Sequence, residues 1–398
     1  MITRRGFVSL LAVATRGQDE LQALYDAHDW FALARRVTAS SPLQKKGAVA
    51  AAFHRFGEAE KLLRRSARDG GDETAEAHGH LINLYARAGM WRKAYGSVRA
   101  AQKAAPDRAD LQNAEAFYGA LARHPDQKAR RVRPVKLTMS KEGEGLFLPI
   151  AINGKVARYF WDTGANFSVT TESEARRLGM IVEDSVAKVS NSTGGSIGLR
   201  IAMAREIDVG GIPISHVPFL VFGDDQQPFN EMEQEERGGI GLPVQLALRS
   251  MRWTSKGEFE LAFVGAQVGE PNLCFDGLMP VTKLGVEGEE VLVQLDTGAT
   301  TTDLWPPFAK RFAGAIKAGK REKRRVGGVG QNIEVESIVV DQLPVRMGGK
   351  ALTLKPAEIH MEKTDGASLR YYGRVGMDLL RQSERVSIDF RTMQLTLE

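Results

Sequence analysis

Asp162-Thr163-Gly164-Ala165 recurs in this chain as Asp296-Thr297-Gly298-Ala299, 134 residues further on (296 − 162). Each copy follows a short apolar run, residues 159–161 in the first case and residues 291–295 in the second. Short apolar runs that end in a glycine-containing turn are typical of buried strands. Two equivalent carboxylates at matching strand-to-turn corners indicate that one chain carries both halves of a two-aspartate site.

The similarity between the two halves extends well beyond the tetrapeptide. A turn precedes each aspartate by nine residues, at Asn153-Gly154 and at Glu287-Gly288 (162 − 153 and 296 − 287). Two further landmarks follow each aspartate: a Gly-rich tip, at residues 191–198 and 326–331, and a Gly-x-x-Gly segment, at 238–241 and 373–376. Because the landmarks keep the same order and nearly the same spacing, the sequence predicts a duplicated unit of short strands and hairpins.

The paired aspartates predict general acid–base catalysis. If the two units pack face to face, Asp162 and Asp296 share one water molecule, and repulsion between the carboxylates keeps one proton on the pair over a wide pH range. The charged member takes a proton from the water, while the protonated member donates one to a peptide carbonyl. The predicted catalytic residues are therefore Asp162 and Asp296, and this chemistry needs no metal and no cofactor.

The residues beside the aspartates are predicted to support the dyad. Thr163 and Thr297 carry hydroxyls that can hydrogen-bond to the backbone of the opposite loop and hold the two loops in register. Gly164 and Gly298 allow the backbone to approach closely and to direct N–H groups at the carboxylates.

The sequence resembles the retropepsin-like aspartic proteases, especially the bacterial proteins with two fused units. The resemblance covers about residues 140–398 and is carried by the two Asp-Thr-Gly-Ala motifs, by Gly-Arg-Val-Gly-Met-Asp-Leu-Leu at 373–380 and by Arg-Val-Ser-Ile-Asp-Phe at 385–390. It implies two closed β lobes with the dyad between them, and cleavage of an extended polypeptide beneath a hairpin flap. The flap contacts that it implies are Thr193, Gly194, Gly195, Gly327, Gly328 and Gly330.

The chain also departs from that family in informative ways. The first unit has Leu242-Pro243 where the second has Met377-Asp378, so the first half is the more diverged. Pepsin-type enzymes place Ser or Thr after Asp-Thr-Gly, whereas both positions are alanine here, Ala165 and Ala299. A hydroxyl there would stabilise the ionised carboxylate, so its loss predicts activity at mildly acidic to near-neutral pH.

The residues before the duplicated units predict a helical domain at 18–127, rich in Ala, Arg, Glu and Leu. An aromatic residue is followed three residues later by alanine at Phe31, Phe56 and Trp91. The third of these segments resembles a tetratricopeptide repeat, in which small residues let antiparallel helices pack closely, and whose stacked helices often bind a protein partner. A plain helical bundle is the alternative interpretation.

The two short segments that flank the helical domain have their own predictions. Thr3-Arg4-Arg5-Gly6-Phe7-Val8 and the apolar residues after it, ending in Ala12-Val13-Ala14, resemble a twin-arginine export signal. This predicts a signal at residues 1–17 and a periplasmic or secreted protein; an ordinary N-terminal helix is the alternative. Residues 128–136 are predicted to be a basic linker.

Composition sets outer limits on the function. The chain has 398 residues, 43% of them hydrophobic and 26% charged, as in ordinary globular proteins, and a net charge of +5 that gives little reason to expect a nucleic-acid partner. Its single cysteine, Cys274, excludes an intrachain disulfide and a Cys-rich metal site. No run approaches the roughly 18 apolar residues of a membrane span.

Taken together, the residues predict a multidomain protein of the α plus all-β class. Antiparallel helical repeats precede two tandem retropepsin-like β-barrel lobes at 137–265 and 266–398. The predicted function is that of an aspartic endopeptidase acting on polypeptide substrates as a monomer with both catalytic halves in one chain. One alternative is a non-catalytic peptide-binding or scaffold protein that uses the helices. Another pairs the units between chains.

Overall fold

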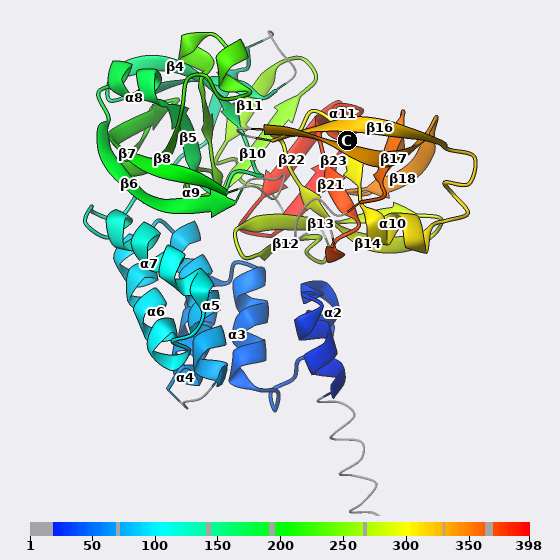
Figure 1. Ribbon diagram of the computed structural model, residues 1–398, viewed down its shortest axis with the longest axis horizontal. Helices are drawn as coiled ribbons and strands as arrows, with labels where there is room; N and C mark the ends of the chain where they lie inside the picture. The colour runs from blue at the N-terminus through cyan, green and yellow to red at the C-terminus, as the bar shows by residue number, and fades with distance from the viewer. Residues whose placement is uncertain are drawn as a thin grey trace, which may run out of the picture.

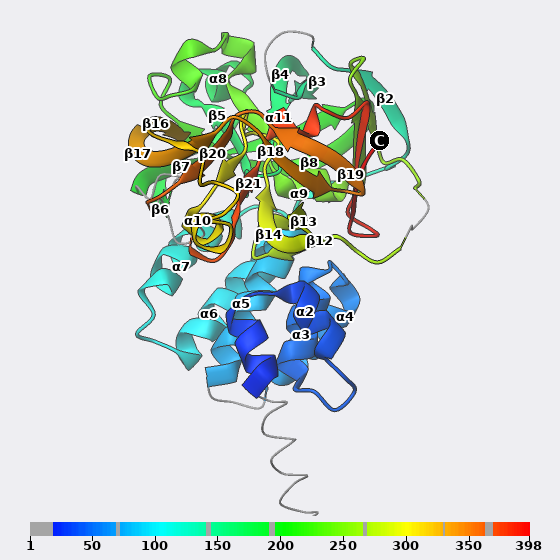
Figure 2. The same cartoon turned by 90° about the vertical axis from the view of Figure 1, so that its right-hand side faces the viewer.

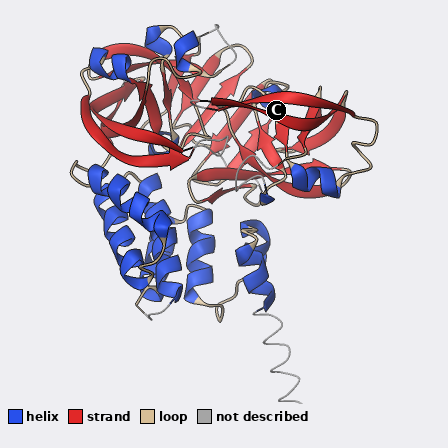
Figure 3. Ribbon diagram, viewed as in Figure 1, coloured by secondary structure: helices blue, strands red, loops and turns tan. Residues whose placement is uncertain are grey.

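A computed structural model describes residues 19–68, 72–140, 145–190, 196–265, 269–328, 331–362 and 369–398. Helices form the N-terminal part and strands dominate the remainder (Figures 1 and 3), so the predicted order of a helical domain followed by two β lobes is confirmed. The predicted signal at 1–17 lies outside the described residues, as do Thr193, Gly194, Gly195 and Gly330.

The helical domain is a series of helices that pack against their neighbours in the chain. Its labelled helices are α2 (Trp30–Arg36), α3 (Leu43–Ala52), α4 (Phe56–Ser66), α5 (Asp72–Arg87), α6 (Trp91–Ala104) and α7 (Ala109–Leu121). Small residues lie where helices approach: Ala59 and Ala94 are fully buried, and a Cβ on Gly47 would lie 2.7 Å from Cγ of Leu63. The predicted helical region is thus confirmed, whereas its relation to tetratricopeptide repeats stays a prediction.

The first β lobe is a closed barrel. Its strands are β1 (Lys128–Ala129), β3 (Phe147–Ile152), β4 (Lys155–Trp161), β5 (Ser168–Thr171), β6 (Ile181–Ser190), β7 (Ser196–Val209), β8 (Ile212–Phe222) and β9 (Gly238–Ile240). They follow the order β1-β8-β5-β9-β4-β3-β7-β6, and an additional pairing of β8 with β7 closes six of them into a ring. Two short helices, α8 (Glu172–Arg177) and α9 (Leu242–Ala247), accompany the barrel.

The second β lobe repeats this arrangement as a curled sheet. Its strands are β12 (Leu273–Asp276), β13 (Met279–Val286), β14 (Glu289–Leu295), β15 (Asp303–Leu304), β16 (Lys320–Gly328), β17 (Gln331–Val340), β18 (Leu343–Met347), β19 (Lys350–Leu354), β20 (Ala357–His360) and β21 (Gly373–Val375), with helices α10 (Pro306–Arg311) and α11 (Met377–Leu380). The parallel pairs β14–β21 and β15–β20 correspond to β4–β9 and β5–β8 of the first lobe. Where the first lobe has the long strands β7 and β8, the second has two shorter strands in each place.

A separate five-stranded sheet joins the two lobes. It consists of β2 (Val135–Thr138), β10 (Ser250–Thr254), β11 (Glu258–Leu261), β22 (Arg385–Asp389) and β23 (Gln394–Leu397), in the order β2-β11-β10-β22-β23. β10 of the first unit pairs directly with β22 of the second, with Met251 opposite Ile388 and Trp253 opposite Val386. The segment predicted as a basic linker contains β1 and the beginning of β2.

The helical domain lies along one side of both lobes (Figures 1 and 2). Gln127 donates to the carbonyl of Pro243 in the first lobe, at 3.0 Å. His28 Nδ1 lies 2.6 Å from an Asp276 oxygen in the second lobe, and the Arg87 guanidinium lies 4.6 Å from the centre of the Phe275 ring. No helix among the described residues is both long and apolar enough to cross a membrane.

Candidate active site

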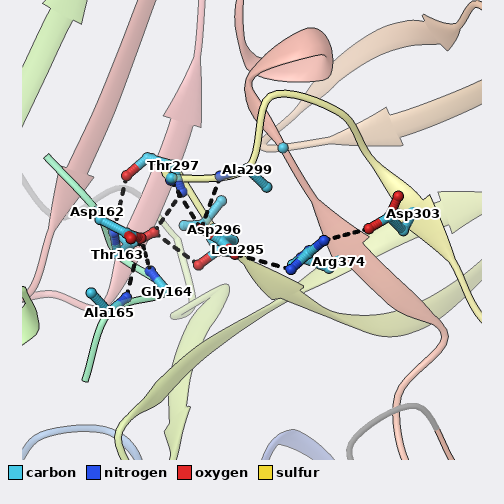
Figure 4. Close-up of polar contacts among 12 residues, drawn as sticks. Asp162, Thr163, Gly164, Ala165, Leu295, Asp296, Thr297, Ala299, Asp303 and Arg374 are labelled. Carbon is cyan, nitrogen blue, oxygen red and sulfur yellow. Dashed lines mark hydrogen bonds and ion pairs between the residues drawn. The ribbon is translucent and has the colours of Figure 1, made fainter. Parts of the chain in front are cut away.

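The two aspartates occupy equivalent positions at the ends of equivalent strands. Asp162 follows β4 and its N–H donates to the carbonyl of Ile240 in β9, at 3.1 Å. Asp296 follows β14 and its N–H donates to the carbonyl of Val375 in β21, at 3.0 Å. The same parallel strand pairing therefore fixes the start of both loops, and the loops meet between the lobes (Figure 4).

Each carboxylate is oriented by the backbone of its own loop. Oδ1 of Asp162 accepts hydrogen bonds from the N–H groups of Gly164 and Ala165, at 2.7 and 3.1 Å. Oδ1 of Asp296 accepts from Gly298 and Ala299, at 2.9 and 3.1 Å. One oxygen of each side chain is thus bound, which leaves the other available for chemistry.

The glycines of the motif lie directly against the opposite aspartate. A Cβ on Gly164 would lie 2.5 Å from Cγ of Asp296, and a Cβ on Gly298 would lie 2.4 Å from Cγ of Asp162. Real Cβ atoms do not approach that closely, so both positions require glycine. The reciprocal contacts also place the two carboxyl groups next to each other.

The two threonines form a symmetrical hydrogen-bond network beneath the dyad (Figure 4). Each hydroxyl accepts from the N–H of the other threonine, at 3.0 Å in both directions. Each also donates to a carbonyl of the opposite strand: Thr163 to Leu295 at 2.8 Å, and Thr297 to Trp161 at 2.6 Å. Both side chains are almost completely buried, so this network fixes the loops relative to each other.

The environment of the dyad favours a shared proton. Burial raises the pKa of Asp162 well above its ordinary range, and the charge of Asp296 together with a side-chain hydrogen bond to Asp296 raises it further. The N–H groups of Gly164 and Ala165 act in the opposite direction but do not outweigh these effects. Asp162 is therefore suited to carry the proton at a pH where an ordinary carboxyl group is ionised.

Residues 148–244 match the family model described as aspartyl protease. The match includes Asp162 and most of the first lobe, and it ends before the second lobe begins. No curated protein matches the chain.

Two solved structures are similar to parts of the chain. A retropepsin-like aspartic protease from Rickettsia conorii is 14% identical, with a TM-score of 0.24, over 35% of this chain and 96% of that one. The retroviral protease-like domain of Ddi1 from Leishmania major is 20% identical, with a TM-score of 0.20, over 28% of this chain and 82% of that one.

A charged residue from the second lobe approaches the two aspartates. Arg374, in β21, has its Nη1 3.6 Å from Oδ2 of Asp296 and its Nη2 bonded to Oδ2 of Asp303 (Figure 4). Burial lowers the pKa of Arg374, but the carboxylates of Asp303 and Asp296 raise it by more, so the guanidinium stays charged. The equivalent position in the first lobe is Gly239, and the site is therefore electrostatically asymmetric.

Arg374 belongs to the sequence motif at 373–380, but the sequence alone predicted no role for it. The signal was the difference between the two Gly-x-x-Gly segments, because an arginine in one half alone gives the two aspartates different electrostatic surroundings. The glycines of these segments pack behind the active-site loops. A Cβ on Gly241 would lie 2.3 Å from the carbonyl carbon of Phe167, and one on Gly376 would lie 2.4 Å from the carbonyl oxygen of Thr301.

A cavity of about 960 Å³ contains the two aspartates and is shared by the first lobe, the second lobe and helix α7. Asp162 and Asp296 both line it, and so does Gly327 of the predicted flap. Gly328 ends β16, opposite Gln331 in β17. A second cavity, of about 650 Å³, lies between the β13–β14 and β18–β19 turns and is lined by neither aspartate.

The single cysteine of the chain lies outside the cavity that contains the two aspartates. Cys274 is completely buried in β12 beneath the helical domain, and burial raises the pKa of its thiol well above the ordinary value. Within the described parts of the chain, no group of three or more His, Cys, Asp or Glu side chains is arranged to hold a metal ion.

Proposed function

We propose that the protein is an aspartic endopeptidase of the retropepsin-like type, with Asp162 and Asp296 as an intrachain catalytic dyad. The observation that carries this proposal is the reciprocal threonine network, which holds two Asp-Thr-Gly loops of one chain face to face. The aspartyl protease match over residues 148–244 and the polypeptide substrates that such a family implies support the same assignment.

The proposed reaction is attack of a dyad-bound water on a peptide carbonyl. Ionised Asp296 takes a proton from the water as the water oxygen bonds to the carbonyl carbon. At the same time, protonated Asp162 donates its proton to the carbonyl oxygen. Asp296, which is now protonated, gives its proton to the nitrogen as the C–N bond of the tetrahedral gem-diol breaks. Asp162, which is now ionised, takes a hydroxyl proton from the gem-diol, so both aspartates return to their starting states. The products are a carboxyl and an amino terminus, without a covalent enzyme intermediate.

The test of this function is the mapping of new termini in a proteome-derived peptide library. Wild-type protein is expected to create new N-termini inside the peptides, and a sample in which Asp162 is replaced by asparagine is expected to create none. Equal sets of new termini in the two samples would assign the cleavage to a contaminating protease and contradict the proposal.

The assignment of roles within the dyad follows from Arg374. A cation within about 4–6 Å of a carboxyl group favours its ionised form, and Arg374 faces Asp296 whereas Gly239 holds the equivalent place on the other side. The other charged residues that line the cavity are Asp110, Glu231, Asp303, Arg325 and Glu358. Of these, Asp303 holds the guanidinium of Arg374 in place beside Asp296. Because the cation stabilises a negative charge on Asp296, we assign Asp296 as the general base and Asp162 as the general acid.

Replacing Arg374 with methionine is expected to move the whole pH–activity profile to higher pH, by on the order of one unit. Without the cation, the dyad loses its first proton at a higher pH, so the acidic limb moves up; the second proton is also held more tightly, so the basic limb follows. The measurement is kcat/KM against pH with one peptide. Arg374→Lys, which keeps a cation, should shift the profile less, and a lower kcat at an unshifted profile would contradict this role.

The optimum of the wild-type profile is expected at mildly acidic to near-neutral pH. Activity needs a protonated Asp162, so it is lost on the alkaline side only as the pH rises through the raised pKa of this group. Neither Ala165 nor Ala299 offers a hydroxyl that would stabilise the charged forms. A maximum below about pH 3, as in pepsin-type dyads, would contradict this expectation.

A further inference from the structure

The active-site loop of the first lobe rests on the helical domain. Phe167, five residues after Asp162, packs edge-on against Phe117 of helix α7, with ring centres 4.9 Å apart, and lies 5.9 Å from the ring centre of Trp91 in α6. The equivalent residue of the second loop is Thr301 (167 + 134). The second loop therefore has no aromatic ring at this position.

Helix α7 is fixed to the first lobe along its length. The buried residues of helices α5 to α7 form one hydrophobic cluster with Val169, Leu220 and Phe222 of the lobe. Just beyond the end of the helix, His124 Nε2 lies 2.6 Å from an oxygen of Glu183 in β6, and Arg123 bonds to the same carboxylate. Figures 1 and 2 show helix α7 beside β6. The helix and the first lobe therefore share one packed interface.

The cavity that contains the dyad has two chemically different ends. The residues that α7 and the first lobe contribute are mainly aromatic and aliphatic; we call the following six the apolar end: Phe117, Tyr118, Phe160, Phe167, Leu220 and Phe222. The same two elements also contribute the carboxylates Asp110 and Glu231 to the cavity lining. Beyond Asp296 the lining includes the charged residues Asp303, Arg325, Glu358 and Arg374. Ala114 and Asn113 of α7 also line the cavity, at its boundary with solvent.

We propose that helix α7 is a part of the substrate-binding cleft, and that the apolar end binds a bulky apolar side chain of the polypeptide substrate. This rests on the proposed function. The substrate is the expected occupant of the apolar end because the apolar end and the two aspartates line one continuous cavity. An extended polypeptide advances about 3.3 Å per residue along such a cavity. A side chain two or more residues from the scissile bond therefore reaches the helix, whose aromatic residues then act as specificity determinants.

The experiment measures kcat/KM for a positional series built on one cleaved peptide, with leucine or serine at each place around the scissile bond. Wild-type protein is expected to prefer leucine roughly tenfold or more at one place at least two residues from the bond. Ala114→Glu puts a charge at the apolar end and should abolish that preference through KM. Gln112→Glu also adds a negative charge, but on the exposed opposite side of α7, and should keep the preference.

A second variant and a short substrate make the outcomes distinct. Asn113→Glu, at a more exposed position in the cavity lining, should also weaken the preference if Ala114→Glu folds poorly. A shortened peptide that spans only the scissile bond should be cleaved equally well by all variants. A wild-type protein without any distal leucine preference, or a preference that Ala114→Glu and Asn113→Glu leave intact, would overturn the role of α7 while leaving the protease assignment in place. Failure of wild type to cleave any peptide would overturn the assignment itself.

Discussion

Asp162→Asn and Asp296→Asn are each expected to lower kcat/KM for peptide cleavage by about 10,000-fold. An amide neither takes a proton from water nor carries the transferable proton that a carboxyl group supplies. The two residues act as one unit, so the double variant should be hardly less active than either single one. Initial rates on a peptide from the cleavage map, followed over days where necessary, measure the loss.

The same substitutions should leave the fold intact or make it more stable. Two carboxyl groups held side by side repel each other when both are charged, and the amide removes that repulsion. Thermal unfolding near pH 7 should therefore give a melting temperature at or above that of wild type. Glu231→Gln removes a carboxylate from the wall of the same cavity and serves as the matched control; it should keep wild-type activity. Full activity in either aspartate variant would refute the dyad.

Thr297→Val is expected to destabilise the protein by about 3 kcal/mol and to lower kcat by roughly 100-fold. Valine has the shape of threonine but leaves the N–H of Thr163 and the carbonyl of Trp161 buried without their partner. The loop that carries Asp296 then loses its fixed position relative to Asp162, and small displacements of catalytic groups have large effects on rate. Urea unfolding and steady-state kinetics measure the two effects.

A neighbouring threonine provides the control for that prediction. Thr300 lies in the same loop with an exposed side chain, so Thr300→Val should change the free energy of unfolding by no more than about 0.5 kcal/mol. Combining Thr163→Val with Thr297→Val should cost less than the sum of the single changes, because each removes the same shared network. Simple additivity would mean that the two hydroxyls act independently.

The sequence was sufficient to predict the duplicated lobes and the pairing of their aspartates. Those inferences depend on local motifs repeated at a fixed spacing, and a repeated motif in a repeated unit has few ways to fold differently. The roles of the threonines and glycines follow from the same duplication, because their partners in the opposite loop belong to the second copy of the motif. The helices before the lobes were predictable from composition and periodicity.

What the sequence did not predict depends on how distant elements dock. Arg374 lies beside Asp296 because β14 and β21 pair in one particular register. Phe167 meets Phe117 because two domains share a core, and nothing near either residue marks that contact. Strand β16 carries several basic residues whose opposite positions in β17 are glutamates, with Lys323 opposite Glu336 and Arg325 opposite Glu334. These pairs depend on the register of the hairpin, which the sequence did not predict.

The five-stranded sheet between the lobes bears on how such a site can be controlled. Met251 of the first unit lies opposite Ile388 of the second in this sheet. If each unit were a separate chain, the same pairing would be a contact between two subunits. Here a continuous polypeptide and a shared pair of strands join the two units, so dilution should leave the two aspartates together. In the proposed enzyme, a compound that separates two subunits would therefore have no target. A ligand that occupies the cavity between the aspartates and helix α7 is the kind of inhibitor that the proposal predicts.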